Sequence, residues 1–368
     1  MPPPVVESNS HLQPARIQPI AIRQESPRFP STRFQGSKRR LAAGIVERVR
    51  SLEFTTVLDA FGGTGAVSHA FKAAGKHVTY NDVLAFNQQI GTALIENDSV
   101  RLTEDNFEAV ERRHPGVVYN DFIARTFDGI YFTREENEWL DVAAGNIRRV
   151  ADPYRRAMAW YALFQSALAK RPYNLFHRKN LYMRLADVSR GFGNKASWDR
   201  PFEDHFRFFA AKANQALIDG GGRCRAIRGD VLSAPDSFDL VYIDPPYMNR
   251  KGQGVDYQQF YHFLEGLMHH GEWAGRIDWS RAHRPLRSEP QYWSDPRVVA
   301  NAFRDVFEKF RSSILVVSYR SDGFPEIETL TALLQSLKHR VEVHVQPERS
   351  YALSTNRRSR EVLWIARD

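Results

Sequence analysis

Cysteine is almost absent from this sequence, with Cys224 alone among 368 residues. One thiol cannot build a disulfide framework or supply the several thiolates of a cysteine-based zinc site. Long apolar runs are missing too, since no stretch approaches the roughly 20 residues that a membrane-spanning helix needs. The N-terminus has no basic start followed by an apolar segment, so we expect no secretory signal. These absences favour a protein of the reducing cytoplasm.

Ordinary composition excludes several classes of protein. Hydrophobic residues make up 42% of the chain and charged residues 26%, close to average globular usage, so a sizeable core can form. Collagen, coiled coil and disorder throughout the chain are excluded on the same ground. The length indicates either two domains or one domain with a large insertion.

Positive charge is concentrated in one stretch of the chain. The formal net charge is +8, but residues 145–225 alone hold 16 basic and 6 acidic residues, a balance of +10, and the remainder sums to −2. A basic region inside a near-neutral chain predicts a polyanionic partner, most simply nucleic acid. The alternative is a solvated basic surface on an ordinary domain.

The first part of the chain divides into an arm and an alternating pattern. Residues 1–30 contain seven of the 19 prolines and show no apolar periodicity, which predicts a disordered arm. From Phe34 onward, strands are expected at 55–60 and 77–82, and helices at 66–74 and 83–95. Strand and helix alternating at this spacing are typical of a parallel doubly wound sheet.

The alternation then breaks for more than 120 residues before strand patterns resume. The later strands are expected at 223–228, 238–243 and 313–318, followed by a closing hairpin of 340–345 and 361–366. We therefore predict a catalytic domain of residues 31–99 and 222–368, interrupted by an insertion of residues 100–221. Helical patterns at 134–146 and 153–170 make the insertion mainly helical.

The first motif that suggests a ligand runs from Asp59 to Gly65 and reads D-A-F-G-G-T-G. Glycines at a strand-to-helix turn let a ligand approach the backbone closely. The dinucleotide fingerprint G-x-G-x-x-G requires a third glycine where this chain has Ser68, which counts against NAD. Asp82, at the end of the next expected strand, could accept the two hydroxyls of a ribose. The alternative is a glycine-rich turn that binds nothing.

The second motif, Asp244-Pro245-Pro246-Tyr247, directly follows an expected strand. Two prolines end the strand and fix the backbone. They would hold an acid and an aromatic ring at the carboxyl edge of the sheet, where ligands bind in open α/β folds. The alternative is a stiff strand exit with the tyrosine in the core. The glycine-rich turn in the same predicted sheet counts against this alternative.

With both motifs in this order, the sequence resembles the DNA adenine methylase (Dam-like) family of N6-adenine DNA methyltransferases. In that family the cofactor motif precedes the D-P-P-Y motif. The similarity covers roughly residues 33–98 and 222–366, while the insertion matches in placement and, at 171–184, loosely in sequence. The matching segments are 34–38 (F-Q-G-S-K), 61–65, Asp230, 244–247, 318–323 and 354–363. The family usually has Gly-Gly-Lys with an upstream Trp, where this chain has Gly36-Ser37-Lys38 and Phe34.

The resemblance implies a Rossmann-like methyltransferase sheet that binds S-adenosylmethionine, in a prokaryotic or phage-type context. Lys38 would pair with the methionine carboxylate, and Asp59 would receive the methionine ammonium. Asp82 would accept the ribose hydroxyls, and Asp230 the amino group of the cofactor adenine. A surface lysine and a turn residue are the alternatives for Lys38 and Asp230. The expected cofactor-binding residues are Phe34, Lys38, Asp59, Phe61, Gly63, Gly65, Asp82 and Asp230.

The D-P-P-Y residues Asp244, Pro245, Pro246 and Tyr247 are the expected catalytic residues. The N6 lone pair of adenine is delocalised and nucleophilic only when the amine becomes tetrahedral. The Asp244 carboxylate and the Pro245 carbonyl could accept the two N6 hydrogens and stabilise the developing positive charge. Tyr247 would stack on the target base after it has flipped out of the duplex. No metal ion is required by this mechanism.

The insertion would recognise DNA, with basic side chains on phosphates and Arg or Asn side chains at base edges. The expected DNA-binding residues are Arg171, Asn174, Arg178, Lys179, Asn180 and Arg184. The apolar stretch 157–169 is expected to be a core helix instead. We thus predict a site-specific adenine-N6 methyltransferase acting on duplex DNA, with a cognate restriction endonuclease as a further partner. The alternatives are an RNA amino-group methyltransferase and a catalytically inactive DNA-binding protein.

Overall fold

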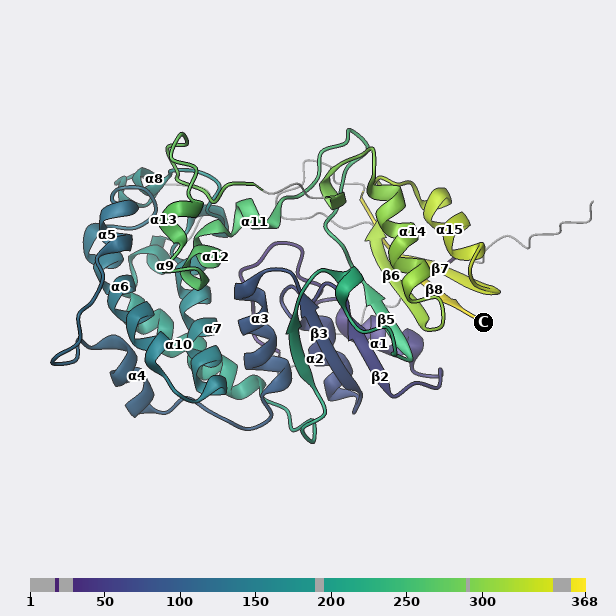
Figure 1. The fold of residues 1–368 in the computed structure, drawn as a ribbon, viewed down its shortest axis with the longest axis horizontal. Helices are drawn as coiled ribbons and strands as arrows, with labels where there is room; N and C mark the ends of the chain where they lie inside the picture. The colour runs from purple at the N-terminus through teal and green to yellow at the C-terminus, as the bar shows by residue number, and fades with distance from the viewer. Residues whose placement is uncertain (1–16, 20–28, 189–194, 289–291, 347–358) are drawn as a thin grey trace, which may run out of the picture.

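The computed structural model describes residues 17–19, 29–188, 195–288, 292–346 and 359–368. In these residues one sheet carries helices on both faces, and a group of helices extends from one side of it (Figure 1). The strands are β1 (Ile17–Pro19), β2 (Thr56–Asp59), β3 (His77–Asp82), β4 (Arg225–Arg228), β5 (Leu240–Ile243), β6 (Ile314–Arg320), β7 (Arg340–Val345) and β8 (Glu361–Arg367). Of the segment 354–363, which resembles the methyltransferase family, residues 354–358 lie outside the described residues.

The sheet confirms the expected fold class. Its strand order is β1-β7-β8-β6-β5-β2-β3-β4, and its pairs are parallel except those of β8, which is antiparallel to β6 and β7. Strands β7 and β8 therefore pair as the predicted closing hairpin. The chain moves outward in one direction through β2, β3 and β4, and in the other through β5 and β6. The boundary between β2 and β5 is a topological switch point, where open α/β sheets bind their ligands.

The central strands β2, β5, β6 and β8 are buried on both faces, which explains why they are largely apolar rather than alternating with polar residues; the edge strand β4 is partly exposed. In β2, Val57 packs in the hydrophobic cluster of one face, and its neighbour Leu58 packs in the cluster of the other. The first face is covered by α1 (Ala42–Val49), α2 (Ala66–Ala73), α3 (Ala85–Gly91) and the π-helical turn η1 (Thr92–Glu96). The second is covered by α14 (Val299–Lys309) and α15 (Ile327–Gln335).

The insertion is helical, as its patterns predicted. Its helices are α4 (Glu104–Glu111), α5 (Phe122–Thr126), α6 (Arg134–Arg149), α7 (Pro153–Ala169), the 3-10 turn η2 (Pro172–Asn174), α8 (Leu181–Leu185), α9 (Lys195–Asp199) and α10 (Phe202–Ala216). Helix α6 begins at a capping box of Thr133 and Glu136, and Asp152 caps α7 ahead of Pro153. Residues 157–169 of α7 are all buried, which confirms the expected core helix.

The insertion continues the core of the sheet instead of forming a separate one. Phe164 of α7 packs edge-on against Phe86 of α3, with ring centroids 5.8 Å apart. One hydrophobic cluster runs from Val57 in the sheet to Phe206 in α10. In Figure 1 these helices lie beside α3, and α11 (Tyr257–Phe260) lies above the space between them and the sheet. The remaining helices are α12 (His262–Met268), α13 (Trp273–Arg276), η3 (Val231–Ser233) and η4 (Tyr292–Ser294).

The expected disordered arm over residues 1–30 lies mostly outside the described residues, and two described parts of it take structure. Phe29 is buried and packs edge-on against His69 of α2, with ring centroids 5.0 Å apart. Ile17–Pro19 forms β1, which pairs in parallel with β7. Burial of an aromatic ring and pairing with a sheet edge outweigh the proline-rich composition at these positions. No helix among the described residues is long and apolar enough to cross a membrane.

Candidate active site

A cavity opens at the carboxyl edge of the sheet, around the switch point between β2 and β5. Its wall combines the 34–38 segment, the glycine-rich turn, the ends of β3 and β4, the D-P-P-Y loop and α11. Seven of the eight predicted cofactor-binding residues line it: Phe34, Lys38, Asp59, Phe61, Gly63, Asp82 and Asp230. The eighth, Gly65, is the N-cap residue of α2.

The glycine-rich turn requires glycine for two separate reasons. Gly63 and Gly65 have φ angles of 49° and 77°, in the left-handed region that side chains rarely adopt. At Gly62 a Cβ atom would lie 2.1 Å from the ring of Tyr80. The Tyr80 hydroxyl donates to the Gly63 carbonyl at 2.7 Å, so the turn is fixed against β3.

Asp59, at the end of β2, is a buried carboxylate with one unpartnered oxygen. Its Oδ2 accepts a hydrogen bond from Ser68 Oγ at 2.6 Å, whereas the buried Oδ1 has no partner among the described residues. Burial raises the pKa of Asp59 to about 6. A buried oxygen without a partner is costly unless a ligand satisfies it, so this position suits a cationic group. Ser68, in place of the third fingerprint glycine, is the side chain that orients this carboxylate.

Asp82 and Asp230 lie at the ends of the next two strands. Asp82 accepts from the backbone N–H of Gly63 at 3.0 Å and of Leu84 at 2.9 Å, and from Asn87 Nδ2 at 3.0 Å. Burial still raises its pKa to about 6. Asp230 caps η3 by accepting from the Leu232 N–H at 2.8 Å, and its second oxygen accepts from the Tyr292 hydroxyl.

Asp244 of the D-P-P-Y motif follows β5 and faces the same cavity as Asp59. Its Oδ1 accepts from Lys38 Nζ and from the Tyr247 hydroxyl, each at 2.9 Å. Burial raises its pKa to about 7, although the Lys38 ammonium acts in the opposite direction. Pro246 also lines the cavity, whereas Pro245 is not among the described lining residues.

Lys38 does not make the contact predicted for it. Its ammonium is buried between two carboxylates of the protein, 2.9 Å from Asp244 Oδ1 and 3.0 Å from Glu361 Oε1, and it also donates to the Tyr247 hydroxyl. The ammonium is therefore engaged at the catalytic motif instead of being directed at a ligand carboxylate. Attraction between opposite charges in a buried setting is the physical reason.

Glu361 is a site residue that reasoning from the sequence did not assign. It begins β8, is 4% exposed, and its Oε1 accepts from Ser318 Oγ at 2.6 Å and from the Tyr247 hydroxyl at 3.1 Å. The signal in the sequence was a lone acidic residue at the start of the apolar run E-V-L-W-I-A. A carboxylate at the beginning of a fully buried strand is unusual because it requires a partner.

Tyr247 is not placed as predicted. Its ring is 7% exposed, packs edge-on against Tyr319 with centroids 5.2 Å apart, and is not among the described residues that line the cavity. The aromatic residues that do line it include Tyr257 of α11 and Tyr261, whose rings are parallel with centroids 6.3 Å apart. The Tyr261 hydroxyl accepts from the Gln35 N–H at 2.8 Å, which ties the 34–38 segment to this wall.

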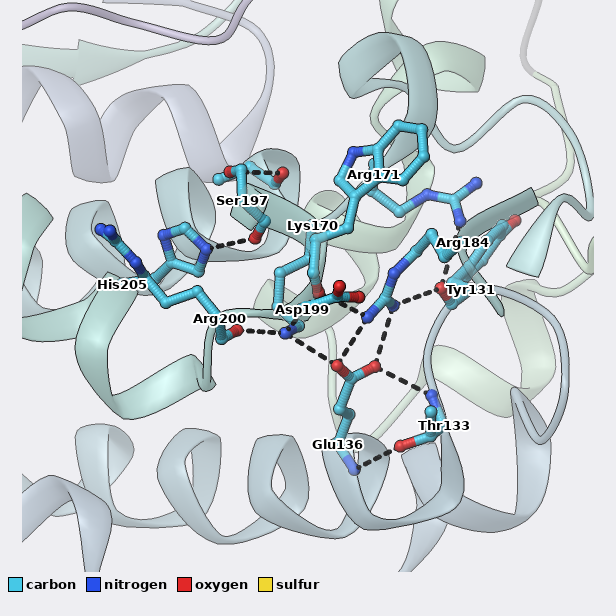
Figure 2. A network of polar contacts seen from close by, with 12 residues as sticks. Tyr131, Thr133, Glu136, Lys170, Arg171, Arg184, Ser197, Asp199, Arg200 and His205 are labelled. Carbon is cyan, nitrogen blue, oxygen red and sulfur yellow. Dashed lines mark hydrogen bonds and ion pairs between the residues drawn. The ribbon is translucent and has the colours of Figure 1, made fainter. Parts of the chain in front are cut away.

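Three of the six predicted DNA-binding residues are internal, so the structure does not place them on a surface that DNA could contact. The buried Arg171 guanidinium donates to the carbonyl of Tyr131 at 3.2 Å (Figure 2) and to those of Leu175 and Arg178 at 3.1 and 3.0 Å. Arg184 donates to both carboxylate oxygens of Glu136, at 2.9 and 2.7 Å. Asn180 is buried as well. These polar groups hold the insertion together, since buried charges persist only when they are paired and hydrogen-bonded.

The other three predicted DNA-binding residues are accessible. Arg178 and Lys179 are exposed, and Asn174 is half-buried. Asn174 and its exposed neighbour Tyr173 have φ angles of 56° and 63°, so this tip adopts a backbone conformation that side chains rarely take. Arg171 fixes the loop from inside, because two of its three acceptors are carbonyls of that loop.

Comparison with known proteins agrees with this geometry. A family model described as D12 class N6 adenine-specific DNA methyltransferase matches residues 34–277. Type II methyltransferase M2.HphI of Haemophilus parahaemolyticus is 27% identical over 330 residues, covering 88% of this chain and 92% of that protein. Modification methylase StsI of Streptococcus sanguinis is 24% identical, and type II methyltransferase M.FokI of Planomicrobium okeanokoites is 25% identical.

The match to StsI covers 90% of this chain and 50% of that protein, and the match to M.FokI covers 87% and 49%. The chain therefore spans about half the length of those two relatives. The family match includes the glycine-rich turn, Asp59, Asp82 and the D-P-P-Y loop. The chain belongs to the D12 class of N6 adenine-specific DNA methyltransferases.

Proposed function

We propose that this chain transfers a methyl group from S-adenosylmethionine to N6 of an adenine flipped out of duplex DNA, at the cavity between β2 and β5. Adenine methylation in DNA follows from the family, while the cofactor, the duplex and the residue roles are our proposal. One observation carries it. The D-P-P-Y carboxylate of Asp244 faces the same cavity as the buried Asp59, whose Oδ1 has no partner among the described residues.

The described residues fit the cofactor. S-adenosylmethionine would supply the methyl group as a sulfonium. Asp59 Oδ1 would receive the methionine ammonium, and Asp82 would bind the ribose hydroxyls at the end of β3. Phe61 and Asp230 would hold the adenine end, next to Trp293, which packs edge-on against Phe61 at 5.1 Å. Lys38 belongs to the catalytic group in this proposal, because its ammonium is bound to Asp244 and Glu361.

Catalysis would rest on acceptors for the N6 hydrogens. The Asp244 carboxylate and the Pro245 carbonyl would accept the two hydrogens, which favours the tetrahedral amine and stabilises its developing positive charge. Alignment of the nitrogen with the methyl group would provide most of the remaining acceleration. Lys38 would hold Asp244 in place and ionised.

The target base would have to leave the duplex, because a stacked and paired adenine cannot enter the cavity. Tyr257 lines the cavity and offers a ring for stacking. Stacking by Tyr247, as predicted, requires its ring to leave its contact with Tyr319. Arg178 and Lys179 would contact phosphates. We also propose a cytoplasmic location, where bacterial DNA lies, and a cognate restriction endonuclease, on the ground that the relatives bear type II or modification names.

The test uses tritiated S-adenosylmethionine with duplex DNA and, separately, RNA, followed by digestion and identification of the labelled nucleoside. We expect N6-methyladenine in DNA, and Asp244→Ala should abolish transfer while cofactor binding stays measurable. Label found only in RNA would refute the proposal, and no label in either nucleic acid would favour an inactive DNA-binding protein.

A further inference from the structure

A second buried carboxylate lies beside the catalytic one. Lys38 Nζ is 2.9 Å from Asp244 Oδ1 and 3.0 Å from Glu361 Oε1, so both carboxylates contact the same ammonium. The side chains of Lys38 and Glu361 are 7% and 4% exposed, and that of Asp244 is 15% exposed. If both acids were ionised, the three described side chains together would carry a buried net negative charge, which is costly. The arrangement therefore favours taking up one proton.

The Tyr247 hydroxyl connects the two carboxylates. It lies 2.9 Å from Asp244 Oδ1 and 3.1 Å from Glu361 Oε1, and it accepts a hydrogen bond from Lys38. A hydroxyl has one proton, so at any moment it can donate to only one of the two acids. Ser318 Oγ, 2.6 Å from Glu361 Oε1, keeps that acceptor in place. Nothing in the methyl transfer as proposed above uses Glu361.

We propose that Glu361 is a positioning residue for the D-P-P-Y carboxylate and accepts, through the Tyr247 hydroxyl, the proton that N6 loses on methylation. This inference rests on the proposed function, since it concerns the same transfer.

The proton and bond changes balance. The bond between sulfur and the methyl carbon breaks as the N6 lone pair bonds to that carbon, which leaves N6 with a positive charge. An N6–H bond then breaks, and its proton bonds to the Asp244 carboxylate. Asp244 passes a proton to the Tyr247 oxygen while Tyr247 passes its own to Glu361. The products are neutral N6-methyladenine and the thioether form of the cofactor. Asp244 is ionised again, and Glu361 is protonated until it returns its proton to water after product release.

A pH profile distinguishes this role from a structural one. Burial is the main cause of the raised pKa of Asp244, and Glu361 raises it further through its negative charge. Removing that charge should therefore lower the pKa of Asp244 and move the acid limb of the rate profile to lower pH. The titratable or charged groups that face Asp244 are Lys38, Asp59, Tyr242, Tyr247, Tyr257, Tyr319 and Glu361.

The experiment measures single-turnover methyl transfer to duplex DNA, with the full chain, across pH. In Glu361→Gln, which has nearly the same size, we expect the plateau rate to fall about 100-fold, at the low end of general-base effects. We also expect the acid limb to move to lower pH, while the Kd for S-adenosylmethionine stays unchanged. Glu361→Asp, which keeps the negative charge, should have its acid limb at the same pH as the wild-type protein. Its plateau rate should lie between those of Glu361→Gln and the wild-type protein. An unchanged rate and limb in Glu361→Gln would overturn the inference.

Tyr247→Phe tests the connection, because it removes the hydroxyl and keeps the ring. It should slow transfer as Glu361→Gln does, and the double variant should be no slower than the slower single one, since both interrupt one path. Independent, multiplying losses would overturn the path through Tyr247. If wild-type protein methylates DNA and Glu361→Gln is unaffected, this inference alone fails. If wild-type protein methylates no DNA, the proposed function itself fails.

Discussion

Replacing Arg171 with alanine should damage the fold of the insertion rather than its contact with DNA. The guanidinium is buried and donates to the carbonyls of Tyr131, Leu175 and Arg178, and it packs over the ring of Tyr131 at 4.5 Å. Each hydrogen bond from a charged donor contributes about 1.5–3 kcal/mol. Because water can enter the space left by truncation, we expect a total loss of about 3–5 kcal/mol of unfolding free energy, in line with other buried polar networks.

The matched control is Arg178→Ala, seven residues along the same loop. The Arg178 side chain is exposed, so its loss should change stability by no more than about 0.5 kcal/mol. If it contacts a phosphate, its removal should weaken binding to every DNA sequence and reduce the salt slope of log K by about 1. Thermal unfolding followed by circular dichroism, and fluorescence anisotropy with labelled duplex at several salt concentrations, measure the two effects. Equal stability of the two variants, with the larger loss of DNA affinity in Arg171→Ala, would refute this reasoning.

Three further results are expected at the cofactor cavity. Gly62→Ala should lower affinity for S-adenosylmethionine at least about tenfold by calorimetry, since its Cβ would overlap the Tyr80 ring. Gly75→Ala, at positive φ but with nothing within 4 Å of its Cβ, should cost some stability through its left-handed backbone and leave this affinity unchanged. Affinity for S-adenosylmethionine should fall as pH drops through about 6, where Asp59 loses the charge that attracts the ammonium; a flat profile from pH 5 to 8 would contradict this. Asp59→Asn should abolish binding of S-adenosylmethionine. It should also raise the unfolding free energy of the cofactor-free protein at pH 7 by up to about 3 kcal/mol. The reason is that folding raises the pKa of this carboxyl from 3.8 to about 6, so its contribution to stability is present below pH 3.8 and is lost as pH rises through 6. An unchanged or lower melting temperature in that variant would contradict the burial argument.

Most of the fold was predictable because its central strands are buried on both faces. Such strands are short apolar runs, and each of those expected in the catalytic region is present. The site edge was predictable for the same reason, since Asp59, Asp82 and Asp244 each directly end or follow one of these runs. Phe29 and Ile17–Pro19 were missed because a buried ring and a three-residue edge strand have no periodicity to detect.

Residue roles were harder to predict, because sequence gives charge but not burial. Arg171 and Arg184 add to the same positive count as Arg178 and Lys179, yet two of the four are inside. The local pattern separates them only in part: both buried arginines lie next to apolar helices, at the end of α7 and within α8. Their partners are distant in sequence, because Glu136 lies 48 residues before Arg184.

The basic insertion therefore has two kinds of positive charge with different consequences. Lys170 and Arg184 share the carboxylate of Glu136, and Arg171 donates to carbonyl groups, so these three cations of the +10 are buried inside the insertion and do not contact phosphates. Arg178 and Lys179 lie on the loop that Arg171 fixes, at the tip where Tyr173 and Asn174 hold an unusual backbone. Internal charge thus positions the external charge. The measurable consequence is a weaker salt dependence of DNA affinity than the number of basic residues in the insertion suggests. The reason is that only cations in contact with phosphates release counterions from DNA.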